Sequence, residues 1–360
     1  MPPPDSEGPA GAVPLSAVEF HDFRRAVRLH QQWLGQGLGR RADFSNLNLS
    51  GFDFSGLDMT GAIFRGAHLA GANLSGANLS KADLRNATLH RAAMTEALLC
   101  GTDASGADLT EASLDRSCLC KAKLVGCDFT GADLVEAKLE KANLDRAVLI
   151  GADLLGVNLS GATLKQATVD SFTIAQCHAN RLALPDDIVA PSYREMTIND
   201  FVLAMLRHEI WIATDGNEGS RLNLDLVKIP YLKMKGRNLA GARIHRCQIE
   251  GGAWHHVDLD MADLAYTDLC RLDLRSSKLR GTNLRRANLA HACLVSTMLT
   301  PIRIEVSNRL SPANLEGAIL SHADLTNAIF NGANLRRASI NGCIVTGTLW
   351  HDAEMTAVRR

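Results

Sequence analysis

Large apolar residues fall on every fifth position of residues 42–176, with Ala104 as a departure. The series opens at Phe44 and Leu49 and closes at Val169 and Ile174. Helices and strands repeat their side-chain directions every 3.6 and 2 residues, so neither explains a period of five. A fixed period over such a length is typical of a repeat architecture. The stretch therefore predicts one long array of short, similar units.

Each unit has a regular internal pattern. The residue two before the large apolar one is mostly alanine, as at Ala72 and Ala132, and the residue between them is mostly Asp or Asn. Alternation along an extended chain points the two apolar side chains inward and the polar one outward. The other two positions hold Ser, Thr, Gly or charged residues, which turns accept. Each unit is expected to form one side of a coil, with coils about 4.8 Å apart.

A second array with the same period covers residues 222–356. Its register slips by one residue between Ile304 and Leu310, in a segment with two prolines that cannot donate backbone hydrogen bonds. We therefore predict an irregular bulge or projecting loop over residues 300–312. Residues 357–360 are predicted to be a short tail.

Helical patterns precede both arrays. The first covers Ser16 to Gln36 and opens with a capping box, and the second begins at Thr197. Because the first helix has an apolar stripe with nothing of its own to pack against, residues 16–41 are predicted to cap the open end of the first array. Residues 177–221 are predicted to hold a linker and the second cap. Residues 1–15 lack a basic region and a long apolar region, and are predicted to be a disordered leader.

Both helices end with the motif His-X-X-Trp, at His30 and Trp33 and again at His208 and Trp211. A glycine, an arginine and the first apolar position of an array follow each motif, so the chain is predicted to be an internal duplication of cap plus array. We expect the motif to orient each cap, with the histidine bound to backbone and the tryptophan packed on the first coil. The apolar side of the second helix is predicted to contain Phe201, Val202, Leu206, Ile210 and Trp211.

The units that begin at Ala72 (Ala-Asn-Leu-Ser-Gly) and Ala107 (Ala-Asp-Leu-Thr-Glu) follow the pattern Ala-Asp/Asn-Leu-X-X. The chain thus resembles the pentapeptide-repeat family over most of its length. The resemblance implies an all-β solenoid, the right-handed quadrilateral β-helix with four repeats per coil. Some members resemble duplex DNA in size and charge, bind gyrase and confer quinolone resistance.

Charge and hydropathy narrow the functional classes. The formal net charge is −1, and polar residues interrupt every apolar stretch, so a soluble cytoplasmic protein is expected and a membrane protein is not. Residues 42–176 hold 16 acidic and 11 basic residues, whereas residues 222–356 hold 12 acidic and 16 basic ones. Six cations within one coil of the second array are expected to form a solvated face interleaved with aspartates, with an anion-binding patch as the alternative: Arg271, Arg275, Lys278, Arg280, Arg285 and Arg286.

The nine cysteines show no paired spacing. Cys100 and Cys120 are twenty residues apart, so they are expected at one outward position on adjacent coils, within the Cα distance that a disulfide tolerates. Cys118 lies nearby. Reduced, unliganded thiols are favoured because the cytoplasm is reducing and a fourth ligand is lacking. Four others occupy the alanine position, where cysteine acts as a small apolar residue: Cys127, Cys177, Cys247 and Cys343.

Known catalytic signatures are missing from the sequence, so no enzyme activity, metal or cofactor is expected. The many aspartates are expected to bond their own turns. His255 and His256 beside Trp254 fall at turn positions and are interpreted as solvated residues. Outward apolar residues of the first array are predicted to form a face for a protein partner or a homodimer: Val125, Val135, Val148, Ile150 and Leu155.

Three functions remain open. The favoured hypothesis is a non-catalytic scaffold for protein interactions, with an unknown partner. The alternative is a DNA-mimicking modulator of DNA gyrase or topoisomerase. It ranks second because the second array is basic, whereas such members usually form one strongly acidic rod. Contact of the arginine cluster with nucleic acid or another anionic surface is the least favoured.

Overall fold

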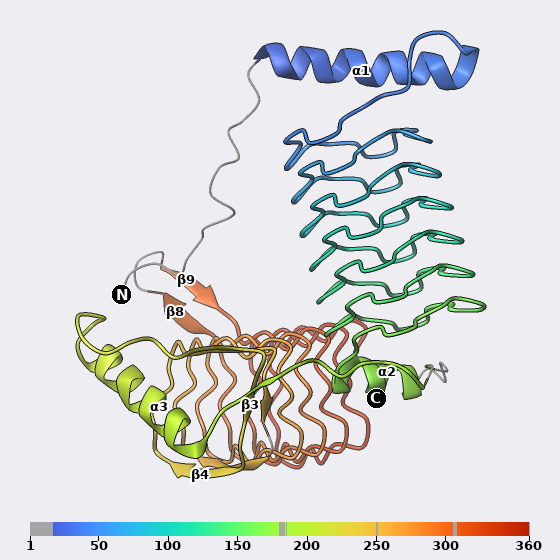
Figure 1. Ribbon diagram of the computed structural model, residues 1–360. Coiled ribbons are helices and arrows are strands. Elements are labelled where there is room, and N and C mark those ends of the chain that lie inside the picture. The colour runs from blue at the N-terminus through green and yellow to red at the C-terminus, as the bar shows by residue number, and fades with distance from the viewer. Residues whose placement is uncertain (1–16, 180–183, 185, 250, 305–307, 360) are drawn as a thin grey trace. The chain divides into compact units, whose positions relative to one another are not determined.

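The computed structural model describes most of the chain (Figure 1), namely residues 17–179, 184, 186–249, 251–304 and 308–359. The predicted leader, the capping residue Ser16, the centre of the predicted loop and Arg360 lie outside these residues. The chain divides into two units, the first ending at Ala190 and the second beginning at Pro191. Each unit contains one array and its own helices.

The first array is a stack of coils. Parallel β-bridges join residues twenty apart, from Asp43 with Ile63 to Val148 with Thr168. Twenty residues are four repeats of five, so each coil has four sides. The alanine and large apolar positions are buried through the middle of the stack, whereas Leu47, Leu159 and Ala162 near its ends are partly or largely exposed. The interior is thus built from two inward side chains per repeat, as the alternation predicts.

The turn positions explain which residues recur there. The second residue after each large apolar one has a positive φ, for example 59° at Glu96 and 68° at Gly101. This left-handed conformation is free of steric cost for glycine and costs other residues about 1–2 kcal/mol. Glycine therefore recurs at this position.

Helix α1 (Ala17–Gln36) lies across the first coils of this array (Figure 1). Its residue Phe23 packs into a group of aromatic side chains, with ring centroids 4.9 Å from Phe52, 5.2 Å from Phe54 and 5.8 Å from Phe44. Ala26 and Val27 of α1 also pack against the core of the first array.

The far end of the first array differs from the prediction. The period of five continues to Ile174, but α2 (Ser171–Ala179) is a helix. Asp170 precedes it and accepts a hydrogen bond from the N–H of Thr173 at 2.9 Å, which is the bond of a helix N-cap. Phe172 and Cys177 are buried on α2, so Cys177 is apolar packing as expected but not in a repeat. Phe172 and Ile174 match the five-residue register by sequence alone, and the cap overrides it.

The second array begins with regular strands. Three parallel pairs join residues twenty apart, β2 with β5, β3 with β6 and β4 with β7, and β1 adds to β3. Isolated bridges continue the same spacing as far as Lys278 with Met298. The strands are β1 (Arg194–Glu195), β2 (Asn223–Asp225), β3 (Val227–Ile229), β4 (Leu232–Lys235), β5 (Arg243–His245), β6 (Gln248–Ile249) and β7 (Gly252–His255).

The predicted irregular loop is an insertion larger than one residue. Asn283 bridges Asn314, so the bridge partners are 31 instead of 20 residues apart and eleven residues are extruded. They include the antiparallel pair β8 (Ile302–Ile304) and β9 (Arg309–Ser311), in which Leu310 is exposed. Eleven residues equal two repeats plus one, which is why the sequence showed a slip of one. The assignment of Ile304 and Leu310 to core positions is therefore wrong.

Helix α3 (Ile198–Ala213) lies across the start of the second array (Figure 1). Thr197 caps it, and its Oγ1 accepts a hydrogen bond from the N–H of Asp200. Phe201 is fully buried and stacks on Trp254, with ring centroids 6.0 Å apart. Trp254 thus fills a core position where leucine is usual, and α3 supplies its partner.

Candidate functional site

A buried histidine ties each helix to its array. Nδ1 of His30 accepts a hydrogen bond from the N–H of Ala42, and Nδ1 of His208 accepts one from Leu222, both at 3.1 Å. A ring nitrogen that accepts carries no proton, so each imidazole is neutral with its proton on Nε2. In His208 this Nε2 lies 3.2 Å from the carbonyl oxygen of Ala240. The histidines therefore join the end of each helix to backbone of the first coil.

The surroundings of these histidines keep them neutral. Burial lowers the pKa of His30 and of His208 below the ordinary value. Protonation of Nδ1 would also replace the acceptor by a second donor facing an N–H group, and the link would break. Trp33 and Trp211 stack on the two rings, with centroids 5.4 and 5.6 Å away. The tryptophans thus cover the links from outside.

The loops after the motifs are equivalent as well. A Cβ added to Gly39 would lie 2.4 Å from the oxygen of Leu29, and one added to Gly219 would lie 2.2 Å from the oxygen of Arg207. Both glycines have positive φ, 84° and 77°. The next arginines donate to the first coils: Arg41 to the carbonyl of Gly61 and Arg221 to the carbonyl of Gly241.

The outward faces of the helices differ. Helix α3 buries Phe201 and Met205 together with the histidine, whereas Leu206 and Ile210 are 42% and 46% exposed. The prediction of a single apolar side that unites Leu206 and Ile210 with Phe201 is wrong, because α3 has two apolar stripes and only one of them faces the array. Leu203, 49% exposed, completes the outer stripe.

The matching positions of α1 are polar. Aligning His30 with His208 places Arg25, Arg28 and Gln32 opposite the three outward apolar residues of α3. All three are exposed. The duplicated helices thus share a buried face and a histidine link, and differ on the face that is turned away from the array.

Three cysteines of the first array come together. The sulfur atoms of Cys100 and Cys118 are 2.8 Å apart, and those of Cys118 and Cys120 are 3.5 Å apart. All three sulfur atoms lie within 4.8 Å of one another. The closest pair is therefore Cys100 with Cys118 and not the predicted stack of Cys100 on Cys120. Cys118 lies two residues before Cys120, on the other side of Leu119, and it reaches diagonally toward Cys100 on the adjacent coil.

Sequence reasoning missed a carboxylate beside these thiols. Oε2 of Glu140 lies 3.0 Å from the sulfur of Cys120, and this hydrogen bond lowers the pKa of Glu140. Burial, followed by the bond to Glu140, raises the pKa of Cys120 to about 12. Burial also acts to raise the pKa of Cys118, but its contacts with Cys100 and Cys120 outweigh this and lower it. The sequence contained the information needed to find this carboxylate, because Glu140 follows Cys120 by twenty residues, the length of one coil.

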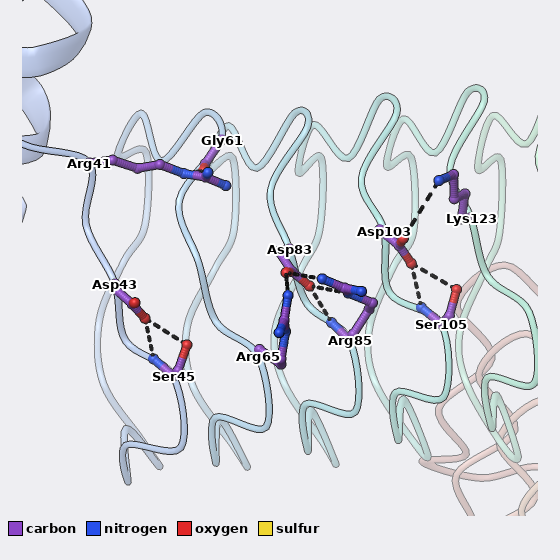
Figure 2. A network of polar contacts seen from close by, with 10 residues as sticks. All are labelled: Arg41, Asp43, Ser45, Gly61, Arg65, Asp83, Arg85, Asp103, Ser105 and Lys123. Atoms are coloured by element: carbon purple, nitrogen blue, oxygen red, sulfur yellow. Dashed lines mark hydrogen bonds and ion pairs between the residues drawn. The ribbon is translucent and has the colours of Figure 1, made fainter.

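The aspartates of the first array hold their own turns (Figure 2). Asp43 accepts hydrogen bonds from the N–H and the hydroxyl of Ser45, at 3.0 and 2.6 Å. Asp83 lies between Arg85 and Arg65, at 2.7 and 2.9 Å. The hydrogen bond from Arg85, chiefly, holds the pKa of Asp83 well below its ordinary value. This face is a ladder of paired charges and not a cluster of free carboxylates.

The six cations of the second array do not form one patch. Four successive repeats lie on four sides of a coil, so residues 271–286 pass around it. Arg275 pairs with Asp273 at 2.6 Å, and Lys278 pairs with Asp258 at 3.0 Å. Arg280 pairs with Asp260, and Arg285 lies near Glu316. Of the other two cations, Arg286 is buried and Arg271 is exposed. The paired arrangement supports the solvated, interleaved face and contradicts a compact anion patch.

The predicted apolar partner face is smaller than expected. Val125, Val135, Val148 and Leu155 are half-buried, and Ile150 is only 5% exposed. The inclusion of Ile150 is therefore wrong, because exposure at a turn position depends on neighbouring segments that the repeat period does not encode.

Of the two histidines beside Trp254, His256 is an exposed turn residue as predicted, whereas His255 is the half-buried last residue of β7, so its predicted turn position is wrong. Nε2 of His255 lies 3.0 Å from a carboxylate oxygen of Asp273, and His256 has a positive φ of 53°. The carboxylate of Asp273, which also pairs with Arg275, thus holds His255 at the end of its strand.

Comparison with known families agrees with this architecture. The profile of the pentapeptide repeats matches eight copies within residues 40–166, 268–300 and 309–347. These matches cover more than half of the chain. The chain belongs to the pentapeptide-repeat family, which confirms the resemblance seen in its sequence.

Solved structures with similar coils are also pentapeptide-repeat proteins. HetL, a protein involved in heterocyst differentiation regulation from the cyanobacterium Nostoc sp. strain PCC 7120, is 25% identical, over 90% of this chain and 92% of HetL, with a TM-score of 0.27. Full-length QnrB1, a plasmid-mediated fluoroquinolone resistance protein, is 15% identical over 65% of this chain and 91% of its own, with a TM-score of 0.23. Rfr23 from the cyanobacterium Cyanothece 51142 is 25% identical over 39% and 95%, with a TM-score of 0.16.

No curated protein matches the sequence. Within the described residues, none of the helices has the length and apolar character needed to cross a membrane.

Proposed function

We propose that the protein is a non-catalytic, cytoplasmic scaffold for protein interactions, made of two capped pentapeptide-repeat arrays. In this proposal each array is a right-handed quadrilateral β-helix, and α1 and α3 are its caps. Bridges between residues twenty apart and the packing of Phe23 and Phe201 against the first coils support this arrangement. The arrays supply rigidity, and the outward side chains supply recognition.

The observation that carries the proposal is the outer stripe of α3, formed by Leu203, Leu206 and Ile210. These side chains are between 42% and 49% exposed on a helix whose duplicate has polar residues at the same positions. Covering the exposed part of such a side chain is worth about 1 kcal/mol, since full burial of a leucine gives about 1.5–3 kcal/mol. A partner that covers the stripe would therefore gain binding free energy that α1 does not offer. We assign the stripe to a helix or strand of another protein.

Cross-linked affinity capture from the native cell tests the proposal. The bait is the full chain, and its variant carries Leu203→Glu and Leu206→Glu. The matched control carries Arg25→Glu and Arg28→Glu at the equivalent positions of α1. A specific partner should be captured by the wild type and by the control and lost from the α3 variant. Capture that is equal for all three baits would contradict the assignment.

The half-buried residues of the first array are proposed as a second contact. Val135 and Leu155 are outward and apolar, although each is only partly exposed. Substituting both by Asp should weaken capture of the same partner less than the α3 variant does. If the substitution changes nothing while the α3 variant abolishes capture, this second contact is removed from the proposal.

Gyrase modulation is the second candidate, supported by the excess of acidic over basic residues in residues 42–176. The ion pairs around Asp83 and Asp103 weaken it, because they use carboxylates that a DNA mimic would present. A supercoiling assay with purified gyrase decides between the two. No effect at micromolar protein would remove this candidate and leave the scaffold.

A further inference from the structure

The three thiols of the first array have the geometry of a soft-metal site. Among the described residues, they are the only group of three potential ligands whose atoms lie within 4.8 Å of one another. A tetrahedral zinc ion with Zn–S bonds of about 2.3 Å needs sulfur atoms about 3.8 Å apart. The two shortest separations, 2.8 and 3.5 Å, are below this value, and all three sulfur atoms lie within 4.8 Å of one another. An ion between them would require Cys100 and Cys118 to move apart by about 1 Å.

The backbone beneath the thiols is fixed. The N–H of Leu99 donates to the carbonyl of Cys118 at 2.7 Å, and the N–H of Gly101 donates to the carbonyl of Cys120 at 2.9 Å. These bonds flank Cys100 on both sides and hold two adjacent coils in register. A site built on such strands is pre-organised, so little ordering free energy is spent on binding.

Glu140 contacts Cys120 and lies outside the group of three, and it is the candidate for a fourth donor. Its Oε2 lies 3.0 Å from the sulfur of Cys120, while its Oε1 accepts a hydrogen bond from the side-chain amide of Asn158 at 2.7 Å. A ligand that is itself hydrogen-bonded from behind is typical of metal sites, because the outer partner fixes its orientation. Asn158 thus turns one oxygen of the carboxylate toward the thiols.

We propose that Cys100, Cys118, Cys120 and Glu140 bind one Zn²⁺ ion. Thiolates select soft or borderline cations such as Zn²⁺ and Cu(I) over Ca²⁺ and Mg²⁺. The carboxylate as fourth donor favours Zn²⁺ over Cu(I), for which three thiolates are enough. Binding releases the thiol protons, and the positive charge of Lys138, beside Cys118, offsets part of the resulting negative charge. The ion links adjacent coils in the middle of the array.

Co²⁺, used as a spectroscopic probe for Zn²⁺, tests the proposal with the full chain under reducing conditions. One equivalent should give a thiolate-to-cobalt charge-transfer band and the d–d bands of tetrahedral Co²⁺, and one equivalent of Zn²⁺ should remove both. Cys118→Ser should lose the bands. Glu140→Gln should keep a weaker spectrum, with the affinity lowered at least about tenfold. Cys270→Ser, at a partly exposed cysteine of the second array, should match the wild type.

Several results would overturn the site. The absence of tetrahedral bands in the wild type is one, and equal binding by Cys118→Ser is another. A Cys100–Cys118 disulfide that persists in the purified chain after mild reduction, seen by mass spectrometry, would assign the cluster to thiol oxidation instead. Circular dichroism of each variant shows whether a lost spectrum reflects unfolding, and Glu140→Gln tests the site without removing a thiol.

Discussion

Helices α1 and α3 occupy equivalent places in the two units but differ on the faces that they turn away from the arrays. Phe23 and Phe201 occupy equivalent positions and pack on aromatic core residues, and each helix ends in a stacked His-Trp pair. The buried faces are thus nearly interchangeable. The outward faces are arginine-rich on α1 and leucine-rich on α3. Attachment to the array constrains one face of each helix, and the other face is free to carry the difference between the two units.

The largest effect is expected from substituting the glycine that both units have in the loop after the His-X-X-Trp motif. Gly219→Ala places a Cβ 2.2 Å from a backbone oxygen at a φ of 77°, so the chain must move. We expect the second unit to lose about 3 kcal/mol or more of its free energy of unfolding. Gly39→Ala should cost the first unit a similar amount. Urea unfolding monitored by tryptophan fluorescence measures both.

Gly51→Ala is the control for this pair. Its φ is 72°, but an added Cβ would meet nothing within 4 Å, so only the backbone cost of about 1–2 kcal/mol applies. Equal losses for Gly51→Ala and Gly219→Ala would show that the close helix–loop contact is not what stabilises the unit.

The histidine link gives the next largest effect. His208→Ala removes a buried acceptor and leaves the N–H of Leu222 without its partner. The expected cost is about 2–4 kcal/mol, from the unpaired donor and the cavity together. His208→Asn should recover part of it, because its side-chain oxygen lies close to where Nδ1 was. His30→Ala should act alike on the first unit, and a loss below about 0.5 kcal/mol in either unit would contradict the shared link.

These contacts separate what could be predicted from the sequence from what could not. Repetition revealed the arrays, the duplicated motif and its glycine and arginine, since each occurs twice at matching positions. The insertion in the second array, the helix α2 at the end of the first array and the exposure of individual side chains occur once each, so repetition could not reveal them. The insertion of eleven residues around β8 and β9 looked in the sequence like a slip of one residue. Asp170 caps helix α2 although the five-residue pattern of apolar residues continues past it. Which apolar stripe of α3 faces the array depended on packing that only the structure contains.

The cluster of Cys100, Cys118 and Cys120 was likewise only partly predictable from the sequence. Cys100 and Cys120 were paired by the twenty-residue spacing, and the same spacing leads on to Glu140. The diagonal reach of Cys118 was not visible, because it depends on the directions of side chains on two adjacent coils. The twenty-residue spacing therefore predicted that Cys100, Cys120 and Glu140 lie in one column, but it did not predict that Cys118 joins them.

Acid should weaken both links. Burial lowers the pKa of His30 and His208 in the folded state, so below the unfolded value of about 6.5 the unfolded chain binds more protons. Each histidine then contributes stability that is complete above pH 6.5 and is lost as the pH falls toward the folded pKa. The loss is at most about 1.4 kcal/mol per pH unit for each residue. Urea midpoints from pH 7.5 to 5 measure it, and His208→Asn should flatten the curve of the second unit alone.

The smallest effect tests the difference between the helices directly. Leu206→Arg places on α3 the residue that α1 has at Arg28, and the reciprocal change is Arg28→Leu. Because both positions face away from the arrays, each swap should change the free energy of unfolding by about 0.5 kcal/mol or less. A loss above about 1.5 kcal/mol for Leu206→Arg would make Leu206 part of the core and remove the basis of the proposed interaction face. A small loss together with abolished capture of a partner would show that the side chain serves binding and not folding, which is what the contrast between α1 and α3 requires.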